Sequence, residues 1–245
     1  MSDKENARNK PGSFRKHLLY EIKEGVYKHQ DKLPSEAELA KIMGVSRTLV
    51  RDNLALLEQE GFISRRQGIG TIINKHVLDV VTRVDLEMEF LEMIKEAGAK
   101  PEGTILETGT INCDAHIAGH LGVHENTPVL MVSRLVKADG KPAIFCDDYV
   151  SFKIVQDYSY QREDLEKPIF HFLKKFCHTE VYMDLTMIRP VLADERLSKL
   201  LSIPVGSPLL HMDEVGYDID GRRVLYSDEY YADGILKHTV LRKKI

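Results

Sequence analysis

Long hydrophobic runs are absent from this sequence of 245 residues. No stretch approaches the roughly eighteen consecutive apolar residues that suggest a membrane-spanning helix. The first residues, MSDKENARNKPG, are too polar for a signal peptide, so we expect a cytoplasmic protein with no membrane partner. The three cysteines, Cys113, Cys146 and Cys177, are widely spaced and form no C-x-x-C motif, which argues against a disulfide framework and predicts reduced thiols.

The residue sets typical of enzymes are also missing. We find no nucleophile with a base and an orienting group, no glycine-rich phosphate loop and no metal triad, and we expect no catalysis, no cofactor and no metal. One alternative is open, because Cys113, His116, His120 and His124 have a spacing that can hold zinc on one face of a helix. The helix is expected to end near Gly122, which favours ordinary solvated or core histidines.

Acidic and basic residues are divided unequally along the chain. Residues 1–77 hold 14 lysines and arginines against 10 aspartates and glutamates, whereas residues 78–245 hold 20 against 28. A basic first part suits a module that binds the DNA backbone, and an acidic second part suits a domain that does not. The length and the 43% hydrophobic content allow two modest domains, each with its own core.

Residues 33–73 contain the parts of a winged helix-turn-helix in order. A helical stripe over about 13–27 precedes them. Ser35 and Glu38 form a capping box that starts one helix, and Gly44 with Val45 breaks it before Ser46 offers a second N-cap. Apolar residues then recur on one side of the second helix, and two short strands at 62–64 and 71–73 predict the wing.

The second helix carries a basic end that suits DNA. Arg47 and Arg51 lie one turn apart, and a guanidinium fork matches the O6 and N7 atoms of guanine. Ser46 and Thr48 can donate to phosphate oxygens near the helix N-terminus. Between the wing strands, Gly68 allows close approach to the minor groove, flanked by Arg65, Arg66 and Gln67.

This stretch resembles the GntR family of bacterial transcription regulators over about forty residues. The matching segment reads LPSEAELAKIMGVSRTLVRDNLALLEQEGFISRRQGIGTII. Carried over by position, the DNA contacts that the resemblance implies fall on Glu36, Ser46, Arg47, Thr48, Arg51, Gln67 and Gly68. One departure is Ala37, where the family usually has arginine, so we expect one DNA contact to be missing and the operator preference to differ.

The second part of the chain contains an internal repeat. The segment from Asp114 matches the segment from Asp194 at an offset of 80 residues, which becomes 81 at the turns Asp139-Gly140 and Asp220-Gly221. Each copy predicts a helix followed by a β-hairpin. Two such halves are expected to pair into one antiparallel sheet with a ligand cleft where they meet, although the duplication can also serve only to build the sheet.

Over residues 86–240 this pattern resembles the UTRA domain of HutC-type GntR regulators. The resemblance implies an α+β protein, in which a winged helix-turn-helix is followed by a chorismate-lyase-like domain with an antiparallel sheet. We expect a disordered tail (1–12), a DNA-binding domain (13–74), a linker (75–85) and an effector-binding and dimerisation domain (86–245). The implied function is a small-molecule sensor that alters DNA affinity.

The resemblance also implies where an effector binds. Sugar-phosphate-sensing members carry polar residues at positions that here are Val136, Cys146, Pro168-Ile169-Phe170 and Leu225, and only Arg134 and Tyr231 keep the pattern. We therefore expect an effector other than a sugar phosphate: an aromatic, nucleobase-like or acidic metabolite anchored by Arg134. The candidate effector-binding residues are Arg134, Cys146, Asp148, Phe170, Leu225, Asp228 and Tyr231.

Together these patterns predict a homodimeric repressor that binds a palindromic operator in double-stranded DNA and is released by a small metabolite. The two half-sites are expected about one helical turn apart. Two alternatives are an enzyme with a chorismate-lyase-like fold, which fold alone does not establish, and a DNA-binding protein without a ligand.

Overall fold

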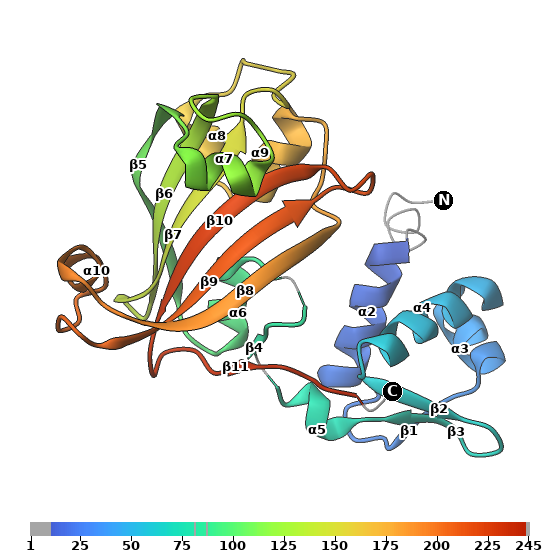
Figure 1. Ribbon diagram of the computed structural model, residues 1–245. Coiled ribbons are helices and arrows are strands. Elements are labelled where there is room, and N and C mark those ends of the chain that lie inside the picture. The colour runs from blue at the N-terminus through green and yellow to red at the C-terminus, as the bar shows by residue number, and fades with distance from the viewer. Residues whose placement is uncertain (1–10, 81, 87, 244–245) are drawn as a thin grey trace. The chain divides into compact units, whose positions relative to one another are not determined.

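The computed structural model describes residues 11–80, 82–86 and 88–243. The chain forms two compact units: the first combines Met1–Leu86 with Thr239–Ile245, and the second is Glu87–His238 (Figure 1). The chain therefore passes between the units twice. No helix within the described residues is long and apolar enough to cross a membrane.

The first unit is a winged helix-turn-helix. Its three main helices pack their apolar sides into one core, which includes Phe14, Leu18, Leu39, Val50 and Leu54. A small antiparallel sheet with the strand order β1-β3-β2 completes the unit, and its hairpin of β2 and β3 forms the wing. The elements are α2 (Pro11–Lys23), β1 (Lys32–Leu33), α3 (Glu36–Met43), α4 (Arg47–Gln59), β2 (Ile63–Arg66) and β3 (Gly70–Ile73).

Local capping interactions define the ends of α3 and α4. The Ser35 side chain accepts from the amide of Glu38, whose carboxylate accepts from the amide of Ser35, as the capping box predicts. Gly44 ends α3 with a φ of 67°, a left-handed conformation that glycine adopts without strain. Ser46 caps α4 by accepting from the amide of Leu49. The predicted helix, turn and helix are confirmed.

The structure differs from the expected tail and linker. Residues 1–10 lie outside the described part of the chain, but residues 11 and 12 belong to α2. The segment expected as a linker holds α5 (Lys75–Leu78) and β4 (Thr82–Arg83). Val77 is buried in the core of the first unit, and Arg83 is buried over the ring of Phe62.

The end of the chain returns to the first unit. Strand β11 (His238–Thr239) pairs with β4, and Leu241 packs against the apolar core of the winged helix-turn-helix. A Cβ atom added at Gly61 would lie 2.3 Å from Leu241, which shows how closely this segment covers the core. The ammonium of Lys243 donates to the carbonyls of Glu58 and Gln59 at the end of α4.

The second unit is built on a six-stranded antiparallel sheet in the order β5-β6-β7-β10-β9-β8. The predicted α+β fold is confirmed. Its elements are α6 (Phe90–Glu96), β5 (Pro101–Asn112), α7 (Ala115–Leu121), β6 (Pro128–Ala138), β7 (Lys141–Ser151), α8 (Arg162–Leu165), α9 (Ile169–Phe176), β8 (Met183–Leu192), α10 (Glu195–Leu201), β9 (Pro208–Tyr217) and β10 (Arg223–Ala232).

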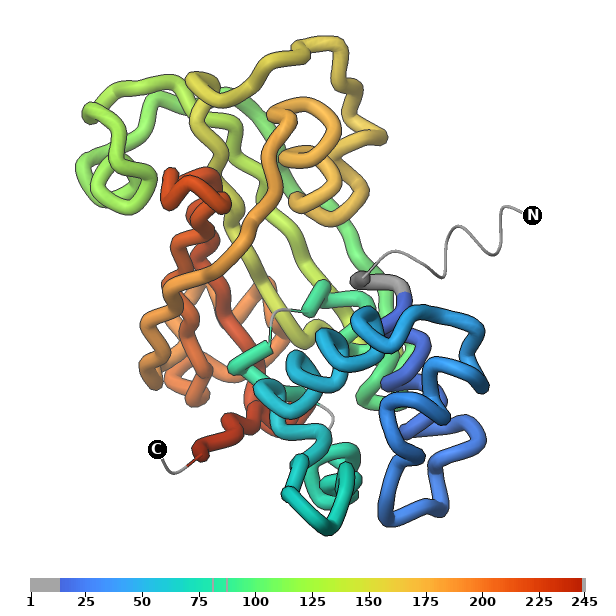
Figure 2. Tube along the Cα trace, turned by 90° about the vertical axis from the view of Figure 1, so that its right-hand side faces the viewer, coloured from blue at the N-terminus to red at the C-terminus, as the bar shows by residue number. Residues whose placement is uncertain are grey.

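The internal repeat accounts for this sheet. Asp114 and Asp194 cap α7 and α10 in the same way, each accepting from the amide three residues further on. Each helix is followed by a hairpin, and the two hairpins pair through β7 and β10. Each repeat also begins with a strand, β5 or β8, which the sequence comparison missed. Figure 2 shows this strand, helix and hairpin path once in green to yellow and again in orange to red.

Side chains alternate between the two faces of the sheet. One face, which we call the cavity face, carries α6 and α9 and includes Arg134, Asp148 and Leu225. The other, the α7/α10 face, includes Val129, Phe145 and Tyr226 under the two repeat helices. Successive strand residues point to opposite faces, so Asp148 lies on the cavity face and its neighbour Asp147 lies on the α7/α10 face.

Candidate DNA interface and effector cavity

The N-terminal end of α4 is exposed and basic. The side chains of Arg47 and Arg51 are 72% and 60% exposed to solvent, so the apolar core does not cover them. Arg47 lies 3.4 Å from the carboxylate of Glu36, which restrains it without burying it. Thr48 is also exposed, and the Ser46 oxygen that caps the helix still has a hydroxyl proton to donate. These five residues form a surface that can contact a DNA groove.

The wing presents a turn at its tip. Gly68 has a φ of 76° and lies with exposed Arg66 and Gln67 in the turn between β2 and β3. Arg65 is arranged differently, because its Nε donates to Glu58 Oε2 at 2.7 Å. The ion pair ties the base of the wing to α4. Arg66, rather than Arg65, is therefore the wing arginine that reaches solvent without an acidic partner among the described residues.

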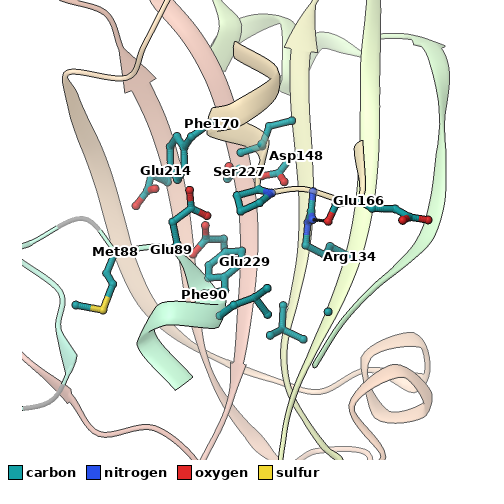
Figure 3. A pocket seen from close by; sticks show the side chains of 15 residues that line it. Met88, Glu89, Phe90, Arg134, Asp148, Glu166, Phe170, Glu214, Ser227 and Glu229 are labelled. Atoms are coloured by element: carbon teal, nitrogen blue, oxygen red, sulfur yellow. Dashed lines mark hydrogen bonds between the residues drawn. The ribbon is translucent and has the colours of Figure 1, made fainter. Parts of the chain in front are cut away.

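The cavity face of the second unit encloses a cavity of about 630 Å³, counted with its open mouth. Strands from both repeats, α6 and the segment before α9 form its walls. The lining residues are Met88, Glu89, Phe90, Leu91, Gly103, Arg134, Val136, Asp148, Glu166, Pro168, Ile169, Phe170, Glu214, Ser227 and Glu229 (Figure 3).

Arg134 is the one cationic side chain among these lining residues. It is 8% exposed, and its guanidinium donates to the backbone carbonyls of Leu165 and Glu166 at 3.2 and 3.4 Å. These bonds hold the group in place and leave part of its donor fork available, since arginine has five donors. The position predicted to anchor an effector therefore lies at the cavity wall.

A hydrogen-bonded carboxylate lies beside this arginine. Asp148 Oδ1 accepts from the Ser227 hydroxyl at 2.7 Å and from Cys146 Sγ at 3.2 Å. Burial raises the pKa of Asp148, although the charge of Arg134 and these two bonds act in the opposite direction. Burial also raises the pKa of the Cys146 thiol well above its usual value, and nearby carboxylates add to that effect. Cys146 is thus a neutral hydrogen-bond donor here and not a reactive thiolate.

Glu214 holds the position in the second repeat that Arg134 holds in the first. Burial raises the pKa of Glu214 to about 7, even though the Thr186 hydroxyl donates to its carboxylate. Near neutral pH this group is therefore poised between its protonated and ionised forms. A cationic ligand group would favour ionisation by supplying the missing opposite charge.

The remaining carboxylates lie nearby. Glu229 accepts from the Tyr231 hydroxyl at 2.6 Å. Figure 3 shows Glu89, Glu214 and Glu229 on one side of the cavity, and Arg134 with Asp148 on the other. Counting Glu166, the described lining holds five carboxyl groups against one guanidinium. Phe90 and Phe170 add aromatic rings to this acidic wall.

The structure places the predicted effector residues in three groups. Arg134, Asp148 and Phe170 line the cavity. Cys146 and Tyr231 lie behind the lining, where each donates to a carboxylate of the wall, and Leu225 packs in the apolar cluster of the same face. Asp228 alone lies outside both groups and forms the third.

Asp228 lies on the α7/α10 face, bonded to His211 and Tyr230, so its inclusion among the cavity residues requires correction. Its cross-strand partner is Asp147, also on that face. The sequence held the signal for the right residue: beyond the hairpin turn the repeat offset is 81, and this offset matches Asp148 with Glu229 rather than with Asp228. Glu214 was likewise available as the match of Arg134 at offset 80. Glu89 and Glu166 come from loops that carry no repeat.

An exposed DNA-reading head and a separate unit with a ligand cavity define a ligand-responsive DNA-binding regulator. Comparison with known proteins agrees. The model of the bacterial regulatory proteins of the gntR family matches residues 14–73, and that of the UTRA domain matches residues 96–233. The chain therefore belongs to the GntR family, in the HutC-type branch that carries a UTRA domain.

Curated relatives span almost the whole chain. The mannosyl-D-glycerate transport/metabolism system repressor MngR of Escherichia coli is 25% identical over 91% of this chain and 92% of its own length. The transcriptional repressor NagR of Bacillus subtilis is 22% identical over 87% of this chain and 86% of its own. These relatives are named as transcriptional regulators, not as enzymes.

Solved structures share the fold. YydK of Bacillus subtilis, described as a possible transcriptional regulator, superposes with a TM-score of 0.77 at 19% identity, covering 94% of this chain and 99% of its own. PhnF of Mycobacterium smegmatis gives 0.59 at 23% identity, covering 87% and 92%.

Proposed function

We propose that the protein is a homodimeric repressor whose effector is a small molecule with a cationic or N–H-rich end and an apolar, aromatic part. The observation that carries the effector class is the excess of carboxyl groups in the cavity wall, five against Arg134 alone among the described lining residues. A sugar phosphate or another dianion placed there would meet buried carboxylates of its own sign, and an uncompensated buried charge costs several kcal/mol. Of the classes expected from the sequence, the acidic metabolite is therefore disfavoured.

The effector class is tested with ligands of matched size and opposite charge. Isothermal titration compares phenethylamine with phenylacetate, because both carry one ring and a short chain. We expect the amine to bind at least tenfold more tightly at pH 7.5, and Glu214→Gln to weaken its binding while leaving phenylacetate unchanged. Micromolar binding of glucosamine-6-phosphate or tighter binding of phenylacetate would refute the charge argument.

DNA recognition is assigned to the exposed end of α4 and the wing tip, with Glu36, Ser46, Arg47, Thr48, Arg51, Arg66, Gln67 and Gly68 as contacts and Arg65 as a support of the wing. Arg47→Ala and Arg51→Ala are each expected to weaken specific operator binding by about 1–3 kcal/mol. Lys28→Ala, which removes an exposed cation that belongs neither to α4 nor to the wing turn, serves as the control and should leave binding unchanged. Gel shifts in which both arginine variants bind as tightly as the wild type would exclude this docking.

The departure at Ala37 offers a gain-of-function test. Ala37 is exposed near the start of α3, so an arginine fits there without disturbing the core. Ala37→Arg is expected to increase affinity for DNA several-fold by adding a phosphate or base contact. A steeper salt dependence of binding would identify the new contact as one to phosphate.

The edge of the second unit supports a dimer. Strand β8 is the last strand of the sheet, and apolar side chains project from both of its faces. An apolar edge strand is a ready template for pairing with a second copy. The exposed residues are Tyr182, Met183, Leu185, Met187, Ile188 and Leu192.

Light scattering measures the dimer directly. Leu185→Glu combined with Met187→Glu should convert a dimer into a monomer and abolish binding to a two-half-site operator, because a two-fold dimer reads an inverted repeat. A wild-type protein that is monomeric at micromolar concentration would remove the dimer from the proposal. The repressor direction rests on the names of MngR and NagR, and it is tested by ligand-induced release from the operator. Because its target is operator DNA, we propose that the protein works in the cytoplasm.

A further inference from the structure

A second cluster of ligand-type side chains lies on the α7/α10 face, opposite the effector cavity. His116 and His120 are one turn apart on α7, and Asp213 lies on β9. One ligand atom from each residue lies within 4.8 Å of the others. The sequence pattern had suggested Cys113 and His124 as partners of the two histidines, but Cys113 is buried and donates to the His124 carbonyl, and His124 lies beyond the end of the helix. Asp213 is the partner that sequence spacing does not reveal.

The hydrogen bonds of His120 leave one ring nitrogen directed at a carboxylate. Its Nδ1 lies 2.9 Å from the backbone carbonyl of His116, an acceptor, so Nδ1 carries a proton. Its Nε2 then faces Asp213 Oδ1 at 3.0 Å. In the neutral ring that nitrogen is also an acceptor, and two acceptors in contact need a cation between them or a second proton on the ring. A histidine whose other nitrogen donates to a carbonyl is the usual arrangement of a metal ligand.

The neighbours of the other two residues fit the same use. Tyr226 Oη lies 2.9 Å from His116 Nε2, and the phenol oxygen can accept from Nε2–H, which leaves Nδ1 of the neutral ring free to bind a metal. Neutral imidazole is the form that binds metals. Arg189 donates to Asp213 Oδ2 at 3.1 Å, which orients the carboxylate and leaves Oδ1 directed at His120.

The matching site in the other repeat has an arginine in place of the first histidine. At offset 80, His116, His120 and Asp213 correspond to Arg196, Leu200 and Ser133. There the guanidinium of Arg196 donates to Asp147 Oδ2 at 3.1 Å, and the Ser133 hydroxyl bonds the other oxygen of Asp147. Both sites therefore pair an aspartate with an arginine, and the Asp213 site adds two imidazoles where the other has Arg196 and Leu200.

We infer that His116, His120 and Asp213 bind a divalent transition-metal ion, with Zn²⁺ as the best match for two imidazoles and a carboxylate. Three protein ligands leave a position for water, which suits the solvent exposure of His116. The separation of 3.0 Å between His120 Nε2 and Asp213 Oδ1 is compatible with two ligands at about 2.0–2.2 Å from one ion. The ion would tie α7 of the first repeat to β9 of the second.

The test uses the full chain without a histidine tag, stripped of metal with a chelator. Titration with ZnCl₂ is expected to show one tight equivalent per chain, and Co²⁺ should give a visible absorption spectrum whose intensity reports the coordination number. His120→Asn and Asp213→Asn should each weaken Zn²⁺ binding at least tenfold. His124→Asn is the matched control, since it removes an exposed histidine just beyond α7 and should bind like the wild type.

A wild-type protein that takes up less than a fifth of an equivalent would overturn the site, and so would a His116→Asn/His120→Asn variant that binds as the wild type does. Thermal melts of the metal-free variants check that they remain folded, which we expect because His116 is exposed and its replacement leaves the core intact. The outcome is independent of the effector proposal, since phenethylamine binding uses the opposite face of the sheet.

Discussion

The two halves of the second unit follow the same backbone path, yet their matching side chains carry different charges. Arg134 in the first half corresponds to Glu214 in the second, and both line the effector cavity. On the other face, His116 corresponds to Arg196. The two repeats therefore have equivalent backbones, but on each face of the sheet their matching positions carry side chains of different charge. A ligand in the cavity would meet Arg134 with Asp148 on one side and the carboxyl groups of Glu89, Glu214 and Glu229 on the other.

The largest expected effect comes from removing the cationic side of the cavity. Arg134→Met should lower the free energy of unfolding by roughly 3 kcal/mol at pH 7, because it leaves buried Asp148 without its positive neighbour. Urea denaturation measures the change. Arg162→Met, which removes an exposed arginine on α8, should change stability by less than about 0.5 kcal/mol. Equal stability of the Arg134 variant and the wild type would show that the two halves do not differ in this way.

Replacing Glu214, which matches Arg134 in the second repeat, should raise the free energy of unfolding instead of lowering it. The folded-state pKa of Glu214, about 7, lies above its ordinary value of 4.5, so the folded chain binds more protons between these two values. The free energy of unfolding should therefore fall as pH rises from about 4.5 to 7 and level off above. Glu214→Gln should remove this slope and stabilise the ligand-free protein at pH 8 by roughly 1–3 kcal/mol.

Thermal melts at pH 5 and pH 8 check this second prediction. Glu163→Gln on α8, an exposed carboxylate, is the control and should keep the wild-type slope. If the Glu214 variant kept it too, another group would be responsible. Binding of an amine should also release protons near pH 6, which titrations in buffers of different ionisation enthalpy detect.

The smallest expected effects compare the two sites under the repeat helices. Arg196 is 60% exposed, so Arg196→Gln should cost at most about 1 kcal/mol by removing its pair with Asp147. His116→Gln should cost less than about 0.5 kcal/mol in chelator. Zinc at a hundredfold excess over its Kd should stabilise the Arg196 variant by about 2.7 kcal/mol and leave the His116 variant unchanged. Equal stabilisation of both variants would place the ion elsewhere.

Local signals were enough to predict the first unit. Ser35, Glu38, Gly44 and Ser46 act within a few residues of themselves, and the structure shows the caps that their spacing predicted. The repeat predicted the sheet for a similar reason, because two copies of one hairpin pattern have few ways to pair. The turn between α3 and α4, and the pairing of the two hairpins, thus followed from short-range chemistry and symmetry, whereas the helix expected over 13–27 spans Pro11–Lys23.

The sites were harder to predict because they depend on which face a side chain joins. Placing Asp228 in the cavity ignored the alternation that puts Asp148 and Glu229 there. Asp213 lies nearly a hundred residues after His116, and no spacing rule joins a helix to a strand at that distance. The predicted second domain, 86–245, also took in Leu241, which packs on the first unit.

The contact of Leu241 with the first unit determines which fragments of the protein keep a complete DNA-reading head. A fragment that stops after residue 86 contains every helix of the DNA-reading head but not the leucine that covers Gly61 or the lysine at the end of α4. Such a fragment should melt earlier than the same head in the intact chain.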